Sequence, residues 1–166
     1  MNIPEEQKAL IDKFAKGRVL DYYIYNNGDI EFETEEQGVL LIRNNESYLD
    51  KFAKGKVEHI ISYSNGDIQF ETKEQGYVLI RNNVSYLDQF QKGKVTRSYT
   101  YDNGDIKFET EEQGYVLIRN GESYLDKFQK GKVINCYSYD NGDIKFETEE
   151  QGIMYIVDGE LKNEIN

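Results

Sequence analysis

Hydrophobic and polar positions recur along this chain with a fixed period. The tripeptide Asn-Gly-Asp and a later Gln-Gly pair each occur four times, and every copy starts 38 residues after the previous one. Such regular spacing is the signature of tandem structural repeats. The sequence therefore predicts a single repeat domain over residues 1–166, with units at 8–45, 46–83, 84–121 and 122–159 and a C-terminal tail at 160–166.

The first segment of each unit predicts a short helix. Ser85 is a preferred N-cap residue, Tyr86, Leu87 and Phe90 fall on one helical face, and Gly93 suits the left-handed residue that ends a helix. A helix of about two turns is not stable alone in water, so it must pack against neighbouring strands.

Three strands are expected after this helix. The runs 57–64 and 67–72 flank the pair Asn65-Gly66, which favours a two-residue hairpin turn. The run 77–80 is apolar on both faces, so it should be the most buried strand. The predicted fold class is α+β and β-rich, with four helix-strand-strand-strand repeats that form a curled sheet as a ring, a barrel or a short solenoid. A four-bladed propeller is the main alternative, although its blades usually have four strands and no helix.

The hairpin also predicts which side chains share a face. A two-residue turn places Ile61 and Tyr63 on the core face with Phe70 and leaves Ile60 on the opposite, outer face. Residues 56–93 and 94–131 share 27 of 38 positions, yet six of their 11 differences lie within 58–64. Either the first strand is exposed and weakly constrained, or its outer face differs between units for a functional reason.

That outer face is apolar in the first unit and hydroxylated in the third. An apolar cluster on an acidic surface indicates a partner site, with capping by the N-terminus or by a second copy as the alternative. The acidic positions of the second strand supply the other expected contacts. The candidate partner-binding residues are Leu20, Tyr22, Ile24, Ile60, Glu33, Glu71, Glu109 and Glu147.

Composition and charge narrow the class of partner. The chain is 38% hydrophobic, with 14 Tyr, 8 Phe and no Trp, which is typical of a globular protein. Its net charge of -11 disfavours direct binding to nucleic acid or to an anionic membrane. A basic protein is the expected partner, including one whose surface normally holds nucleic acid. Acidic side chains gather on the second strand and lysines at the helix end, so stacked units would form an acidic and a basic stripe.

The residue types needed for catalysis are not brought together by the pattern. His59 is the only histidine, and its equivalents in the other units are Asp21, Arg97 and Asn135. Cys136 has no neighbouring histidine, and no phosphate-binding loop or Cys/His metal set occurs. We therefore expect no enzyme activity, no cofactor and no metal site. A single cysteine and the absence of a targeting or membrane-spanning segment favour a cytoplasmic location.

The segment Tyr99-x-Tyr101-x-Asn103-Gly104-Asp105-x-x-Phe108-Glu109 resembles the core of a MORN repeat. The Trp, the second Gly-rich stretch and the shorter period of that family are absent here. The resemblance therefore implies shared hairpin chemistry and no function.

The sequence as a whole favours a non-enzymatic protein-interaction module with an acidic, Tyr-rich surface, acting as an inhibitor that occludes a basic nucleic-acid-binding site. An alternative is a glycan or small-ligand module in which Tyr63, Tyr101 and Tyr139 line related pockets. A self-assembling structural protein, and hence a homo-oligomer, is the third possibility, because stacked sheets have open edges.

Overall fold

The structure is a computed structural model that describes residues 2–163. It contains one α-helix and sixteen short or medium strands within those residues. The chain forms two compact halves, Met1–Tyr86 and Leu87–Asn166. We describe these as the N-terminal half and the C-terminal half.

The N-terminal half begins with the α-helix, which is followed by two similar repeats. Each repeat has three strands, a two-residue strand and one turn of 3-10 helix. The elements are α1 (Glu5–Phe14), β1 (Val19–Ile24), β2 (Ile30–Thr34), β3 (Gly38–Arg43), β4 (Glu46–Ser47), η1 (Tyr48–Lys51), β5 (Val57–Ser62), β6 (Ile68–Thr72), β7 (Gly76–Arg81) and β8 (Val84–Ser85). The turn η2 (Tyr86–Gln89) lies at the boundary of the two halves.

The C-terminal half repeats the pattern without an α-helix. Its last strand replaces the two-residue strand and 3-10 turn of the other repeats. The elements are β9 (Val95–Thr100), β10 (Ile106–Thr110), β11 (Gly114–Arg119), β12 (Glu122–Ser123), η3 (Tyr124–Lys127), β13 (Val133–Ser138), β14 (Ile144–Thr148), β15 (Gly152–Val157) and β16 (Glu160–Lys162).

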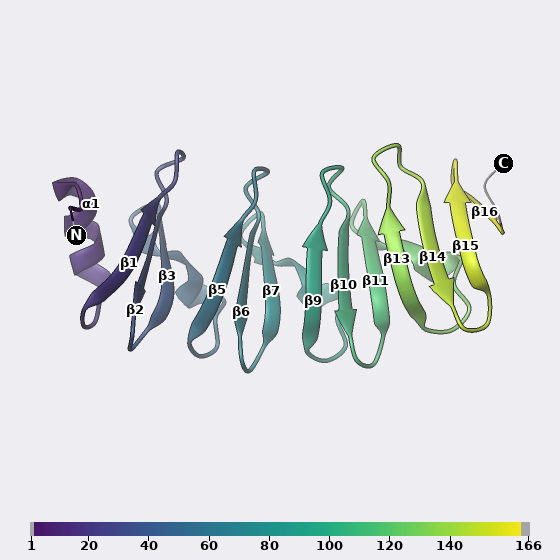
Figure 1. The fold of residues 1–166 in the computed structure, drawn as a ribbon, viewed down its shortest axis with the longest axis horizontal. Coiled ribbons are helices and arrows are strands. Elements are labelled where there is room, and N and C mark those ends of the chain that lie inside the picture. Colours follow the sequence, from purple (N-terminus) through teal and green to yellow (C-terminus); the bar gives the residue numbers. More distant parts are fainter. Residues whose placement is uncertain (1, 164–166) are drawn as a thin grey trace. The chain divides into compact units, whose positions relative to one another are not determined.

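Each repeat is an antiparallel three-stranded meander, as Figure 1 shows for β1–β3 and for β13–β15. Successive meanders within a half are joined by a single parallel pair, Gly38 with Val57 and Gly114 with Val133. A Cβ atom at Gly38 would lie 2.3 Å from the Val57 carbonyl oxygen, and Gly38 has a φ of 74°. Only glycine fits this close approach, so the joint between meanders depends on it.

The core of each repeat lies between its own meander and the third strand of the repeat before it. In the N-terminal half, Val39 and Leu41 of β3 pack in one cluster with Phe70 and Ile80 of the next meander. The C-terminal half repeats this arrangement, with Leu117 of β11 packed in one cluster with residues of β13, β14 and β15. The meanders are therefore stacked face to face within each half.

Helix α1 covers the meander that has no preceding repeat in the described chain. Ile11 of α1 is fully buried and packs with Phe32, Leu40 and Ile42. The helix lies beside β1 in Figure 1. It takes the place that a third strand and a 3-10 turn occupy in the other repeats.

The predicted fold class is confirmed in its main features. Four repeats of about 38 residues form a β-rich protein, and the third strand is the most consistently buried strand in the first repeat. The strand order is linear in each half, so neither half closes into a barrel. The interval 160–166, predicted to be a tail, begins with strand β16, and residues 164–166 lie outside the described residues.

The prediction of a two-turn helix was wrong in the second, third and fourth units, whereas the first unit has helix α1 at the expected segment. The segments at Tyr48, Tyr86 and Tyr124 form single turns of 3-10 helix that follow a two-residue strand. Leu49, Leu87 and Leu125 are nearly fully buried there. Tertiary packing of a Leu anchor therefore decides the conformation, because so short a segment has little intrinsic helical stability.

The predicted two-residue turn was also wrong by one register position. Ser62 pairs with Ile68 and Ile60 pairs with Phe70, so the loop is longer than expected. The amide of Gly66 donates to the Tyr63 carbonyl oxygen over 3.0 Å. Gly66 has a φ of 95°, which fits a three-residue loop whose last residue is left-handed. The slip exchanges the two faces of the first strand.

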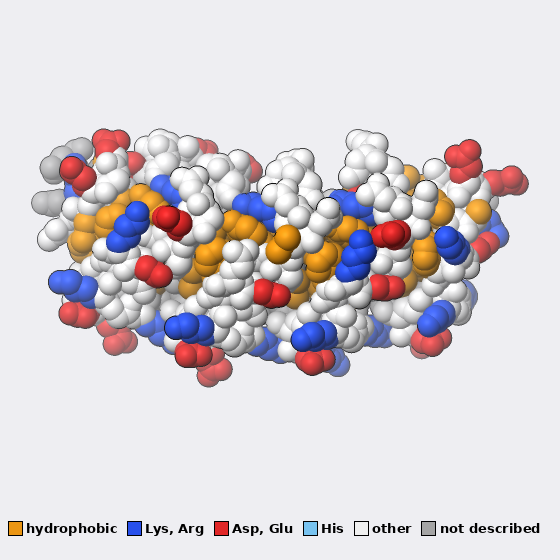
Figure 2. Space-filling view, turned by 180° about the vertical axis from the view of Figure 1, so that it is seen from behind, with side chains coloured by type: hydrophobic (Ala, Val, Ile, Leu, Met, Phe, Trp, Pro, Cys, Tyr) orange, Lys and Arg blue, Asp and Glu red, His pale blue; other side chains and the backbone are white. Residues whose placement is uncertain are grey.

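Charged side chains are mixed on the face that Figure 2 displays. Lys or Arg side chains stand next to Asp or Glu side chains in both halves, and apolar side chains lie in grooves between them. This face does not show the predicted division into an acidic and a basic stripe.

No α-helix in the described chain is long and apolar enough to cross a membrane.

Candidate functional site

Tyrosines stand in pairs at the C-terminal end of three of the four first strands, one inside the strand and one just after it, on the face turned away from the second-strand phenylalanine. Because successive strand residues point to opposite sides, Tyr23 and Tyr25 share the face that is turned away from Phe32. Their rings lie 4.7 Å apart in an edge-to-face arrangement. Tyr99 with Tyr101 and Tyr137 with Tyr139 repeat the pair, each at 4.8 Å.

The two tyrosine pairs of the C-terminal half join into one run. The ring of Tyr101 lies 5.6 Å from that of Tyr137, which connects Tyr99, Tyr101, Tyr137 and Tyr139. We call these four residues the tyrosine ladder. Tyr99 and Tyr137 are 53% and 50% exposed, whereas Tyr101 is 9% exposed. Edge-to-face pairs each contribute about 0.5–1.5 kcal/mol. Because Tyr101 is buried and contacts both Tyr99 and Tyr137, it holds these more exposed rings in place.

A hollow of about 410 Å³ opens beside the end of the ladder, which is within the usual size range of small-ligand sites. Its apolar portion comes from the rings and from an exposed isoleucine, and its polar portion from an amide, a carboxylate and two ammonium groups. The lining residues are Lys107, Asn135, Cys136, Tyr137, Tyr139, Lys145, Phe146, Glu147 and Ile153. This mixture offers stacking surface together with groups that can donate and accept hydrogen bonds.

Lys107 is held in place by three contacts. Its Nζ donates to the Cys136 carbonyl oxygen over 3.1 Å and lies 5.8 Å and 5.2 Å from the ring centroids of Tyr101 and Tyr115. Cation–π contacts of this kind favour a fixed position for the ammonium group. A ligand in the hollow would therefore meet a positive charge in a defined place.

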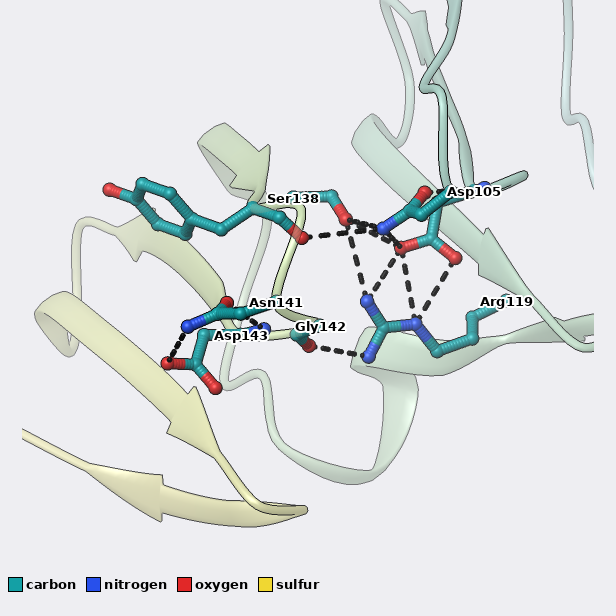
Figure 3. A network of polar contacts seen from close by, with 8 residues as sticks. Asp105, Arg119, Ser138, Asn141, Gly142 and Asp143 are labelled. Carbon is teal, nitrogen blue, oxygen red and sulfur yellow. Dashed lines mark hydrogen bonds and ion pairs between the residues drawn. The ribbon is translucent and has the colours of Figure 1, made fainter.

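A polar network joins the third and fourth repeats next to the ladder (Figure 3). Arg119 donates to both carboxylate oxygens of Asp105, at 2.6 Å for the shortest contact, and to the Gly142 carbonyl oxygen at 2.9 Å. The hydroxyl of Ser138, which stands between Tyr137 and Tyr139, donates to Asp105 over 2.6 Å. The ladder is thus mounted on a strand and turn that buried, charge-assisted hydrogen bonds hold in position.

The N-terminal half has a corresponding hollow with different chemistry. It measures about 540 Å³ and is lined by Asp21, Tyr22, Tyr23, Tyr25, Glu31, Phe32, Glu33 and Val39. Tyr25 donates to Glu31 over 2.6 Å, and burial, together with this carboxylate, raises the pKa of the tyrosine. Glu31 occupies the position of Lys145 and Asp21 that of Asn135, and no lysine is among the residues that line this hollow, so it is acidic.

The expected apolar partner surface is only partly exposed. Tyr22 and Ile24 pair with Phe32 and Ile30 and pack against the core under α1, and Tyr22 donates to the carbonyl oxygen of Asn2. Ile60 packs against the core of the second repeat. The placement of these three side chains on an outer face was wrong because of the register slip, whereas Leu20 remains 39% exposed.

The four predicted glutamates do lie on the outer face, but their surroundings differ. Each pairs with a different first-strand residue: Asp21 with Glu33, His59 with Glu71, Arg97 with Glu109 and Asn135 with Glu147. Glu109 forms an ion pair of 3.7 Å with Arg97. Glu147 lines the hollow beside the ladder. They do not make one uniform acidic surface.

Sequence reasoning named Tyr101 and Tyr139 but missed Tyr99 and Tyr137. The predicted two-residue turn placed all four tyrosines on the core face, and Tyr101 and Tyr139 were named only because they recur next to the Asn-Gly turns. Tyr residues two positions apart, at 99 and 101 and again at 137 and 139, share one face of a strand. With the correct hairpin register, this spacing would have predicted the tyrosine pairs.

Comparisons with known proteins give distant structural likenesses only. No protein-family model and no curated protein matches the chain. Two solved structures of the extracellular domain of BT4673 from B. thetaiotaomicron resemble the chain. One names a one-component system and has a TM-score of 0.43, and the other names a hybrid two-component system and has a TM-score of 0.38. Both are 12% identical to this chain. These matches cover 89% and 90% of this chain but only 23% and 24% of the other chains.

A third similar structure is the extracellular domain of the hybrid two-component system BT3049 from B. thetaiotaomicron. Its TM-score is 0.36 at 15% identity, and the match covers 89% of this chain and 22% of that chain. The chain thus spans less than a quarter of the length of each of these solved structures.

Proposed function

We propose that this chain is a non-enzymatic binding module that holds a carbohydrate on the tyrosine ladder. The observation that carries the proposal is the run of four tyrosines beside a hollow of about 410 Å³. Sugar rings have apolar C–H faces that stack well on the electron-rich face of an aromatic ring. Aromatic side chains that are partly exposed and yet held in place by their neighbours form an apolar patch, and such patches mark binding sites.

The polar groups of the hollow suit the rest of a sugar. Asn135 offers an amide that donates and accepts, Glu147 accepts, and Lys145 donates. The hydroxyl groups of a saccharide both donate and accept hydrogen bonds, so they need acceptors and donors around the sugar ring. Rigid mounting of Tyr137 and Tyr139 through Ser138 lowers the ordering cost of binding.

The test combines a glycan array with calorimetry on the full chain. We expect one or a few related glycans to bind, and Tyr137→Ile to weaken binding by at least about tenfold, because a stacking anchor is lost. Ile is the residue that the second repeat already has at this position, as Ile61. Tyr23→Ile in the N-terminal half is the matched control and should change the affinity by less than about twofold.

An array without signals, together with no heat of binding for candidate glycans, would remove the proposal. Equal losses for Tyr137→Ile and Tyr23→Ile would place binding elsewhere than at the ladder. Circular dichroism on both variants confirms that the fold is kept.

A second candidate is a protein-interaction role with a basic partner, including inhibition of a nucleic-acid-binding protein. The observation that favours it is the net charge of -11, together with the acidic hollow around Glu31 and Glu33. Attraction between exposed charges weakens as salt is added, whereas stacking of a neutral sugar does not. A pull-down whose captured proteins are basic and elute at about 0.5 M salt would support this candidate over the first.

A further inference from the structure

A β-bulge in the second repeat gathers three potential metal ligands at one place. Val57 pairs with Thr72 and His59 pairs with Glu71, so Glu58 is the extra residue between two registered pairs. A bulge sets two residues of one strand against one residue of the partner strand. The side chains of Glu58 and His59 therefore converge on Glu71, and we call these three residues the bulge triad.

The ligand atoms of the bulge triad are close enough to share one ion. One carboxylate oxygen of each glutamate and one imidazole nitrogen lie within 4.8 Å of one another. Ligand atoms around a tetrahedral zinc ion stand about 3.4 Å apart for bond lengths of about 2.1 Å. Small rotations of three surface side chains cover that difference, with no change in the backbone. Among the described residues, this is the one group of three such side chains whose ligand atoms come so close together.

The same bulge recurs in the other repeats with residues that cannot form the set. The corresponding positions hold Leu20 and Asp21 with Glu33, Thr96 and Arg97 with Glu109, and Ile134 and Asn135 with Glu147. In the third repeat the arginine neutralises the glutamate directly, at 3.7 Å. The geometry of the bulge is thus common to all repeats, and only the second repeat equips it with an imidazole between two carboxylates.

We propose that the bulge triad binds a divalent transition-metal ion, with Zn²⁺ as the best-suited ion. Imidazole nitrogen favours zinc, copper, nickel and iron over calcium and magnesium, and the two carboxylates supply the charge that a dication requires. Three protein ligands leave a coordination position open to water or to another molecule, as in zinc sites that are not purely structural. This inference does not depend on carbohydrate binding, because the triad and the ladder lie in different halves of the chain.

The single histidine makes a direct test possible. ZnCl2 is titrated into the full chain while the imidazole signals of His59 are followed by two-dimensional NMR, with calorimetry in parallel. We expect one saturable event of one ion per chain that shifts the His59 signals. A tenfold excess of Ca²⁺ should not reverse the shift, because imidazole is a poor calcium ligand.

Two variants taken from the chain itself complete the experiment. Glu58→Thr with His59→Arg copies the third repeat, and its zinc affinity should fall by at least about tenfold. Asp21→Asn, at the corresponding bulge of the first repeat, is the matched control and should change the affinity by less than about twofold. His59→Asn, which copies Asn135, serves in place of the double variant if that variant has an altered melting temperature.

Three results would overturn the proposal. His59 signals that stay unchanged at saturating zinc would exclude the imidazole as a ligand. Undiminished binding by the double variant would show that zinc is held by scattered carboxylates. Displacement by calcium would show that the triad is only an acidic surface.

Discussion

Single residues decide how the repeats hold their turns. Asp29, Asp67 and Asp105 each accept several hydrogen bonds from an arginine at the end of the third strand, with shortest distances of 2.6–2.7 Å. The aspartate side chains are only 5–7% exposed. The fourth repeat has Val157 where the others have this arginine, and Asp143 is more exposed there. The arginine is thus present in the three repeats whose aspartate is buried and absent from the repeat whose aspartate is more exposed.

Removing one partner of such a pair should be costly. Arg43→Val, which copies Val157, leaves Asp29 buried without its cation and should lower the free energy of unfolding by about 3–5 kcal/mol. The double change Asp29→Asn with Arg43→Val removes the unpaired charge and should recover much of that loss. Urea unfolding of the three proteins measures both effects. An equal loss in the single and double variants would show that arginine packing, rather than charge pairing, carries the contribution.

Cys136 is a buried thiol and should be chemically silent in the folded chain. It is 3% exposed, and burial raises its pKa to about 12, against a smaller opposing effect of Lys107. Because the folded pKa lies above the unfolded one, the thiol stabilises the fold below about pH 9, and this contribution is lost as pH rises toward 12. A thiol reagent at pH 8 should label the native chain far more slowly than the urea-unfolded chain. Rapid native labelling would contradict the buried position.

At the scale of elements, the α-helix acts as a cap for the first meander. Ile11 is fully buried against Phe32 and Ile42, whereas Lys8 on the same helix is 59% exposed. Ile11→Ala should therefore destabilise the N-terminal half by about 2–5 kcal/mol through the cavity that it creates. Lys8→Ala removes only an exposed ion pair with Asp12 and should cost less than about 1 kcal/mol. Thermal unfolding of both variants tests the difference, and similar values would show that α1 is loosely attached.

The elements also show what the sequence could and could not predict. The period, the three strands and the buried third strand follow from residue patterns alone. The hairpin register did not, because Asn65-Gly66 fits both a two-residue turn and a three-residue loop with a left-handed Gly66. That one-position ambiguity placed all four tyrosines of the ladder on the core face, so the ladder was not predicted, and only Tyr101 and Tyr139 were named, because they stand next to the Asn-Gly turns. The bulge at Glu58 could not be predicted either, because one extra residue in a strand does not change the residue types by which a strand is recognised.

At the scale of the whole molecule, charge opposes the fold. The net charge of -11 generates repulsion throughout the chain, while exposed ion pairs such as Lys8 with Asp12 contribute little. Added salt shortens the Debye length from about 30 Å at 0.01 M to about 3 Å at 1 M, which removes the long-range repulsion first. Buried Asp–Arg pairs are screened much less. The net effect of salt should therefore be stabilising.

This balance gives a prediction for the intact chain. The urea midpoint of unfolding should rise between about 0.01 M and 0.5 M NaCl, with an unchanged dependence on denaturant, because unfolding exposes the same area in both conditions. Glu33→Gln, which removes one charge from the acidic hollow of the N-terminal half, should raise the low-salt midpoint and reduce its salt dependence. Lys16→Gln makes the net charge more negative and should have the opposite effect. A midpoint that falls with salt would mean that favourable local ion pairs outweigh the overall repulsion.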